Sequence, residues 1–376
     1  MKLTKAAIAI TMLLFSVYPI YSCTIFMASK GEKTLVGNNE DFIDPESHVW
    51  FLPSEIGKYG RVYFGFGIGL PQGGMNDQGL FFDYAALPPS GKYFPPEKKV
   101  YPGSLVEKAM EECASIDEVM KLFDSYDRQF MVTYQLMFAD KFGNAVIIES
   151  DTLIRKKGDY QICTNFRQSL GKENPYSIER YNIINEMLHK SEDISVDLFR
   201  SMLAKTHQEP GQKQGSPTQY STIYDLKNGV IFLYHFHNYA DVVRIDLYEE
   251  LAKGKHSSKI SSLFTPDLFA YEKYAERKRI KKRTAISLDP SVFDNYVGDY
   301  QVNGLPSITF HISKHEDQLF CRMSGLRTYR IYPEAEEKYF LNVMDSQIEF
   351  HRDDNGIVHS LSFTLYGSAM PARRIL

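Results

Sequence analysis

The sequence predicts an α+β protein followed by a separate all-β domain, in a chain of 376 residues. Tyrosine and phenylalanine number 25 each against one tryptophan, and such aromatic residues favour β-sheets. Before residue 266, β-prone segments alternate with stretches whose apolar residues have helical spacing. From about Pro290 the pattern changes to short strands and turns without helical spacing. A chain of this length is expected to form two domains.

Residues 1–22 have the features of a secretory signal peptide. Lys2 and Lys5 precede an almost unbroken apolar run from Ala6 to Tyr21, which is short for a membrane span. Cleavage after Ser22 would make Cys23 the first residue and change the formal charge from -4 to -6. We therefore expect an exported protein, periplasmic or secreted. The charge gives no reason to expect a nucleic-acid partner.

Two chemistries compete for Cys23. The sequence Ile20-Tyr21-Ser22-Cys23 resembles a bacterial lipobox, which would make the protein an outer-membrane lipoprotein and the membrane its partner. Alternatively, Cys23 is an N-terminal nucleophile whose own α-amine acts as the base. An acylated amine cannot accept a proton, so lipidation of the amine would exclude this role. Lipoproteins usually continue with a polar tether, whereas here a β-prone segment follows at once, which favours the nucleophile.

A hairpin is predicted directly after Cys23. Thr24 to Ala28 and Thr34 to Gly37 are β-prone and flank a polar turn containing Gly31. This register sets Cys23 opposite roughly Asn39, with Asp41 a residue or two beyond. An α-amine titrates at about 7.7–8.0 and a thiol at about 8.5, so proton exchange between them costs little near neutral pH. Asp41 is expected either to orient the amine or to be a solvated turn residue.

The remaining elements follow from periodicity and turn residues. Helical spacing covers Ser104 to Ser125, Ser177 to Lys190 and Ile194 to Leu203. Further strands are expected at Val62–Leu70, Gly79–Tyr84, Met131–Ala139, Ala145–Ser150, Tyr220–Asp225 and Val230–Phe236. After a helical linker over 266–289, the domain over 290–376 is expected to have strands at Tyr296–Tyr300, Ser307–Ile312, Leu319–Met323, Lys338–Val343, Gln347–Arg352 and Ile357–Leu365.

The cysteine and the segment Gly37-Asn38-Asn39-Glu40-Asp41 resemble a known group of proteins. An N-terminal Cys-Thr strand with a G-x-N-x-D segment is similar to the choloylglycine hydrolase, penicillin V acylase and acid ceramidase superfamily of N-terminal nucleophile (Ntn) hydrolases. Bile salt hydrolases place an arginine where Asn38 stands, so the chain looks closer to the isopenicillin N acyltransferase branch. The resemblance implies a four-layer αββα sandwich over residues 23–265.

Three later motifs follow in the same order. Residues 74–80 (GMNDQGL) match a turn of the superfamily, and the nearby oxyanion asparagine is missing, which leaves a backbone N–H near Ala86 as a substitute. Asn165 lies in a T-N-x motif whose asparagine donates to the oxyanion, and Tyr220 lies in a T-x-Y-[ST]-T hairpin. No equivalent of the arginine that family members carry near that hairpin is found. By this resemblance Cys23, Asp41 and Asn165 are catalytic, and Asn38, Asn39, Ala86 and Tyr220 support the substrate or the oxyanion.

No metal and no cofactor are expected. His235 and His237 would share one face of a strand, but no third ligand lies at short spacing. The four cysteines are too few for a disulfide framework. The C-terminal domain is similar to small lipocalin-like, barrel-like domains of exported hydrolases.

The resulting functional hypothesis is an amidase that cleaves a linear amide of a small N-acyl substrate. An acyltransferase with the same acyl-enzyme and a lipid-anchored binding module are the alternatives. Formation of a homo-oligomer is left open.

Overall fold

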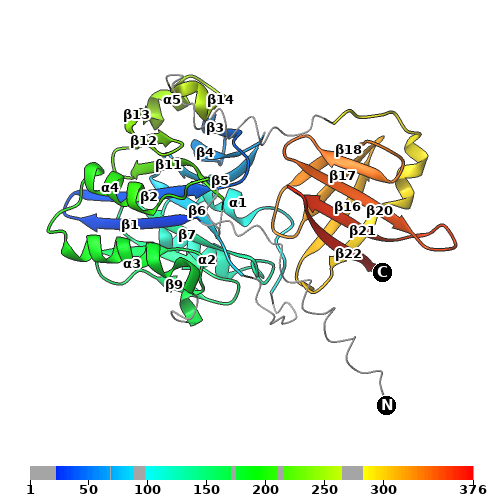
Figure 1. The fold of residues 1–376 in the computed structure, drawn as a ribbon, viewed down its shortest axis with the longest axis horizontal. Coiled ribbons are helices and arrows are strands. Elements are labelled where there is room, and N and C mark those ends of the chain that lie inside the picture. Colours follow the sequence, from blue (N-terminus) through cyan, green and yellow to red (C-terminus); the bar gives the residue numbers. More distant parts are fainter. Residues whose placement is uncertain are drawn as a thin grey trace, which may run out of the picture.

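The computed structural model describes residues 23–67, 69–88, 98–170, 175–210, 216–264 and 283–375. Figure 1 shows two bodies side by side, a layered sandwich built from residues up to 264 and a β-barrel built from the C-terminal part. The expected signal peptide and most of the predicted helical linker lie outside the described residues. Of that linker, residues 283–289 have no regular secondary structure.

Six antiparallel strands in the order β10-β1-β2-β11-β12-β13 form the first sheet. It contains the hairpin of β1 and β2, whose two-residue turn leaves Gly31 with a positive φ of 57°. Lys30 pairs with Lys33 and Thr24 with Asn39, so Cys23 is opposite Glu40, one residue beyond the expected position, because the turn is centred between residues 31 and 32. The strands are β1 (Thr24–Lys30), β2 (Lys33–Asp41), β10 (Tyr160–Cys163), β11 (Thr218–Asp225), β12 (Val230–His235) and β13 (Asn238–Asp246).

Eight antiparallel strands in the order β14-β3-β4-β5-β6-β7-β8-β9 form the second sheet. They are β3 (Ser47–Leu52), β4 (Arg61–Phe66), β5 (Leu70–Asn76), β6 (Leu80–Ala86), β7 (Tyr134–Asp140), β8 (Ala145–Ile148), β9 (Leu153–Arg155) and β14 (His256–Lys259). The sequence patterns predict β4, β6, β7 and β8, whereas β3, β5, β9 and β14 are additional to the expected strands. β9 has three residues, β14 is polar and β5 contains two glycines.

Helices cover the outer faces of both sheets. A core that includes Ile25, Met27 and Val36 fills the space between the sheets. Phe26, Ala28 and Leu35, which alternate with them, face α3 (Pro175–Lys190) and α4 (Val196–Thr206). On the other side, α1 (Leu105–Glu112) and α2 (Ile116–Asp124) pack against the second sheet. The layers are therefore helix, sheet, sheet, helix, as the resemblance implied.

One predicted helical stretch is divided in the structure. The helical spacing over Ser104 to Ser125 is interrupted at Cys113, after which Ser115 begins α2 with a capping box in which its side chain and Glu118 exchange backbone hydrogen bonds. Serine competes with the helix for backbone hydrogen bonds and so begins a new helix instead of continuing the first. The short elements α5 (Leu247–Ala252), η1 (Gln168–Leu170), η2 (Ile260–Leu263) and η3 (Pro290–Asn295) complete the helices.

The C-terminal strands close into an eight-stranded barrel in sequence order, and β15 pairs with β22 to remove the sheet edges. Its aromatic and aliphatic interior includes Tyr300, Phe310 and Phe350. β18 and β22 are additional to the expected strands. The strands are β15 (Gly298–Val302), β16 (Thr309–His315), β17 (Gln318–Met323), β18 (Thr328–Pro333), β19 (Lys338–Leu341), β20 (Ser346–Arg352), β21 (Val358–Leu365) and β22 (Ser368–Ile375).

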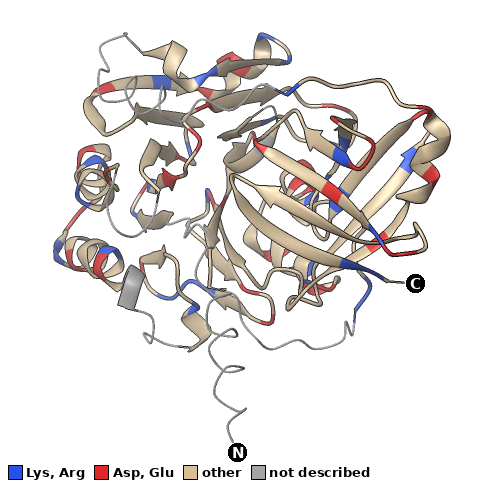
Figure 2. Cartoon of the chain, turned by 45° about the vertical axis from the view of Figure 1, so that its right-hand side comes forward, with Lys and Arg blue, Asp and Glu red and all other residues tan. Residues whose placement is uncertain are grey.

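Polar contacts join the barrel to the sandwich. The Tyr366 hydroxyl donates to Asp44 Oδ2 at 2.7 Å, and Arg327 Nε lies 2.7 Å from Glu107 Oε1. Acidic and basic residues are interspersed along both bodies (Figure 2). Among the described residues, no helix has both the length and the apolar character needed to cross a bilayer.

Candidate active site around Cys23

Cys23 lies at the start of β1, and only 4% of its surface is exposed. Its thiol donates to Glu40 Oε1 at 3.4 Å. Burial, and then the negative charges of Glu40, Asp41 and Asp83, raise the pKa of Cys23 well above its usual value. The sulfur is therefore a thiol at neutral pH, and a nucleophilic role requires a base that removes its proton.

The face of β2 that lies between the sheets carries a cluster of buried carboxyl groups. Asn38 donates from Nδ2 to Asp83 Oδ2 at 2.5 Å and to Glu40 Oε2 at 3.4 Å. Burial raises the pKa of Glu40 to about 8 and that of Asp83 well above its usual value. Burial therefore favours the protonated form of both carboxyl groups, and their charges act on Cys23 to the extent that they ionise. The sequence motif places Asn38 at the site but does not identify Glu40 or Asp83 as site residues. A signal for Asp83 was its position as the one carboxyl in β6, LFFDYAA.

Asp41 ends β2 on the opposite, helix-facing side. It is fully buried and accepts hydrogen bonds from Thr218 Oγ1 and from Gln208 Nε2, the latter at 2.7 Å. Arg180 forms an ion pair with it at 3.1 Å. Burial raises the pKa of Asp41 to about 7, while Arg180 and the two donors lower it. The prediction that Asp41 is a solvated turn residue is therefore wrong, because it is buried within β2, and its orienting role stays a prediction.

Arg180 is the central residue that the sequence did not identify. It projects from α3, donates to Thr24 Oγ1 at 2.7 Å and to Asn165 Oδ1 at 2.9 Å, and so links Asp41 with the residue after the cysteine. Its charge is close enough to Cys23 for the two groups to interact electrostatically. Nothing in the local sequence distinguishes this arginine from the other charged residues of an amphipathic helix, because only the packing of α3 on β1 brings it to the site.

Asn165 and Ala86 are brought together. Asn165 Nδ2 donates to the carbonyl oxygen of Ala86 at 2.9 Å, which connects the loop after β10 with the end of β6 in the other sheet. The two residues that the resemblance assigned to the oxyanion therefore lie in contact, next to Arg180.

Tyr220 and Asn39 differ in their position relative to the cysteine. Tyr220 pairs with Glu40 across β11 and β2, is fully buried, and its hydroxyl has no hydrogen-bond partner among the described residues. Burial and the charges of Glu40, Asp83 and Cys23 raise its pKa. Asn39 points to the helix side, where it donates to Leu203 O at 3.0 Å and accepts from Ser221. Alternation along β2 thus places Asn38, but not Asn39, on the side of the thiol.

The four-layer sandwich, with a buried cysteine directly before its first strand, is the architecture that the N-terminal nucleophile superfamily implies. Residues 28–240, more than half of the chain, match the acyl-coenzyme A:6-aminopenicillanic acid acyl-transferase family, and the chain belongs to this family. The superfamily expected from the sequence motifs is thereby confirmed. Residues 282–372 match a domain family of unknown function, DUF3471.

Solved structures with a similar fold include two altered forms of conjugated bile acid hydrolase from Clostridium perfringens. Each is 16% identical, with 63% of this chain and 96% of the other covered and a TM-score of 0.48. Penicillin V acylase from Agrobacterium tumefaciens is 15% identical, with 60% and 86% covered and a TM-score of 0.38. A search of curated proteins gives no match.

Proposed function

We propose that the protein is an exported amidase that hydrolyses the C–N bond of a linear N-acyl amide through an acyl-enzyme on Cys23. One observation carries the proposal: the buried Cys23 thiol directly precedes β1, beside a network in which Arg180 connects Thr24, Asp41 and Asn165. Membership of an acyltransferase family supports chemistry at an acyl carbonyl.

The proposed reaction begins when removal of residues 1–22 frees the Cys23 α-amine. The amine takes the thiol proton, the sulfur attacks the substrate carbonyl, and a C–S bond forms. The resulting ammonium gives its proton to the leaving nitrogen as the C–N bond breaks. Water then attacks the thioester and forms a C–O bond, its proton passes through the amine to the sulfur as the C–S bond breaks, and the carboxylic acid leaves.

The surrounding side chains have supporting roles in this proposal. Arg180 and Asp41 position the start of β1 through Thr24. Asn165, together with a backbone N–H near Ala86, supports the oxyanion. A donor of this kind contributes about 2.7–4 kcal/mol to the transition state. Asn165 Nδ2 carries two N–H donors, and its contact with Ala86 O uses one of them.

The test uses the processed protein with a free N-terminal Cys23 and a panel of N-acyl amides. We expect amine release, and an intact-mass increase equal to the acyl group when turnover is stopped early. Cys23→Ala abolishes both, whereas Cys163→Ala, which removes a buried thiol from the neighbouring strand β10, retains them. Full turnover by Cys23→Ala or Cys23→Ser would refute the proposal.

Acyl transfer is the second candidate, because the family is named for it. Adding competing primary amines to the reaction distinguishes the two activities. Conversion of the acyl-enzyme mainly to a new amide would assign a transferase, and conversion mainly to the free acid would assign a hydrolase.

Anchoring at the membrane is the remaining alternative. Intact mass of the mature protein from a bacterial host separates it from catalysis. A mass that matches a chain beginning at free Cys23 is expected. A mass increased by acyl chains would make Cys23 a lipid anchor.

A further inference from the structure

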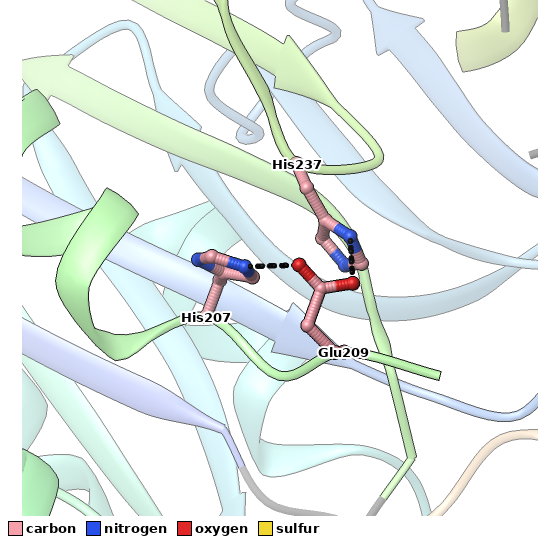
Figure 3. Close-up of side chains that lie close together, drawn as sticks. All are labelled: His207, Glu209 and His237. Carbon is pink, nitrogen blue, oxygen red and sulfur yellow. Dashed lines mark hydrogen bonds and ion pairs between the residues drawn. The ribbon is translucent and has the colours of Figure 1, made fainter. Parts of the chain in front are cut away.

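A cluster of two histidines and one glutamate lies outside the site at Cys23. His207 follows α4, Glu209 comes two residues later, and His237 lies in the turn between β12 and β13. Figure 3 shows both imidazoles directed at the carboxylate. His207 Nε2 is 2.9 Å from Glu209 Oε1, and His237 Nδ1 is 3.3 Å from Glu209 Oε2. The three groups offer ligand atoms that all lie within 4.8 Å of one another.

The orientation of His207 requires a cation between its ring and the glutamate. Its Nδ1 is 2.7 Å from the carbonyl oxygen of Ala204, and only a protonated nitrogen can donate to a carbonyl. In a neutral ring, Nε2 then carries a lone pair, which faces a carboxylate oxygen. A proton on Nε2, which makes an imidazolium, or a metal ion that accepts both lone pairs makes this contact favourable. A backbone carbonyl that fixes the ring through its other nitrogen is common behind metal-binding histidines.

His237 is held in place at a cost to the backbone. Its φ is 70°, in the left-handed region that a side chain with a Cβ seldom adopts. This conformation ends the strand, so His237 does not continue the face of His235 as the sequence pattern predicted. It instead sets the ring beside that of His207, with the two centroids 4.7 Å apart. Phe236 and His237 both have positive φ in the two-residue turn between β12 and β13, and this turn brings together ligand-type side chains that the sequence separates by 30 positions.

The ligand types and their spacing suit a four-coordinate ion. Metal–ligand bonds of about 2.0–2.1 Å imply ligand atoms about 3.3 Å apart, and the two imidazole–carboxylate distances are 2.9 and 3.3 Å. Two imidazole nitrogens and one carboxylate oxygen form a set that Zn²⁺ binds well, with a fourth position left for water. The Glu209 side chain is 56% exposed, which gives an ion access from solvent.

We propose that His207, Glu209 and His237 form a binding site for a divalent transition-metal ion, with Zn²⁺ the best match to the ligands. The proposal does not depend on the function assigned to Cys23. The sequence pattern pairs His235 with His237 and offers no third ligand nearby. In the proposed site His235 is not a ligand, and His207 and Glu209 join His237 from a different part of the chain.

The ion would act on the active site through position. Gln208 lies between two ligands, and its side chain donates to Asp41 Oδ2 at 2.7 Å. Its backbone also exchanges hydrogen bonds with Thr218, the other donor to Asp41. An ion that fixes residues 207–209 would therefore hold Gln208 against Asp41. No ligand of the ion touches the thiol, so its role is to position other residues.

The test begins with the full processed protein, treated with a chelator and returned to metal-free buffer. Zn²⁺ alone is then titrated by calorimetry, and the metal content is measured after desalting. We expect about one equivalent and a zinc-dependent rise in the melting temperature. His207→Gln, Glu209→Gln and His237→Gln should each weaken binding at least about tenfold. Glu209→Gln changes a half-exposed residue, so its result does not depend on a folding defect.

The matched control is His256→Gln. His256 also has Nδ1 on a backbone carbonyl, that of Gly254 at 2.8 Å, and Nε2 on a carboxylate, that of Glu250 at 3.0 Å. It belongs to no three-residue cluster among the described residues, so its loss should leave zinc binding unchanged. A titration of Cys23→Ala excludes binding at the soft thiol. Unchanged affinity in the three ligand variants, or no stoichiometric binding, would overturn the proposal and make the cluster an imidazolium–carboxylate ion pair.

Discussion

Replacing Asp41 by Asn should strongly destabilise the sandwich, because it leaves the Arg180 guanidinium without its carboxylate. Arg180 is only 12% exposed and Asp41 is fully buried. Removing one partner of a buried ion pair costs about 3–5 kcal/mol, since the remaining charge is uncompensated. We expect a loss in this range for Asp41→Asn at pH 7.5, where the carboxyl, with a pKa of about 7, is mainly ionised.

Removing the arginine of this ion pair should cost less than removing the carboxylate. In Arg180→Met the carboxyl keeps its donors Thr218 and Gln208, and it can also take up a proton because burial already raises its pKa to about 7. The Arg180 guanidinium cannot become neutral in this way, because arginine stays protonated in proteins. We expect about 2 kcal/mol for Arg180→Met. The double variant should cost less than the sum of the two by about 1–3 kcal/mol.

Urea unfolding followed by fluorescence measures these values for the sandwich alone, because Trp50 in β3 is the only tryptophan. The matched control is the exposed pair Arg155–Asp117, whose atoms are 2.7 Å apart and whose side chains are 46% and 74% exposed. Its double-mutant cycle should give less than about 1 kcal/mol. A cost below about 1 kcal/mol for Asp41→Asn, or a coupling energy no larger than that of the control, would refute the argument.

Three further predictions concern β2 and β11, the strand that pairs with it. The pKa of Glu40 is raised from 4.5 to about 8, so its contribution to stability is fully present below pH 4.5 and is lost as pH rises through 8. Glu40→Gln should therefore reduce the slope of the unfolding free energy against pH between pH 5 and 8 by up to about 1.4 kcal/mol per pH unit, measured by urea unfolding. An unchanged slope would contradict the raised pKa of Glu40. Tyr220→Phe removes a hydroxyl without a hydrogen-bond partner among the described residues, so it should change the free energy of unfolding by less than about 1 kcal/mol. If that hydroxyl supports the oxyanion, the same substitution should lower kcat about 100-fold on the substrate identified by screening. Unchanged kcat would remove Tyr220 from the site. In Gly37→Ala the new Cβ would lie 2.5 Å from Phe26 Cζ, so we expect the free energy of unfolding to fall by about 1–3 kcal/mol. Phe26→Leu in the same chain should relieve part of this loss. Additive effects of the two substitutions in thermal unfolding would argue against the clash.

Local sequence patterns were sufficient for the elements that contain most of the site. The turn at Gly31 and the alternation around it predict the hairpin of β1 and β2, and with it Asp41 near the start of β1. The change of pattern near Pro290 likewise predicts the all-β domain. Hairpins are short-range structures, so their register follows from turn residues and strand periodicity.

The sequence by itself determined the class of fold, the two-part architecture and the hairpin after Cys23, whose second strand carries Asn38 and Asp41. Only the tertiary structure decided that Arg180 from α3 connects Asp41 with Asn165, that Asp83 joins Glu40 behind the thiol, and that His207, Glu209 and His237 converge. The physical reason is the range of the interactions. Periodicity and turn residues act over a few positions, whereas the side chains that meet across packed sheets and helices depend on strand order and layer packing, which no local pattern records.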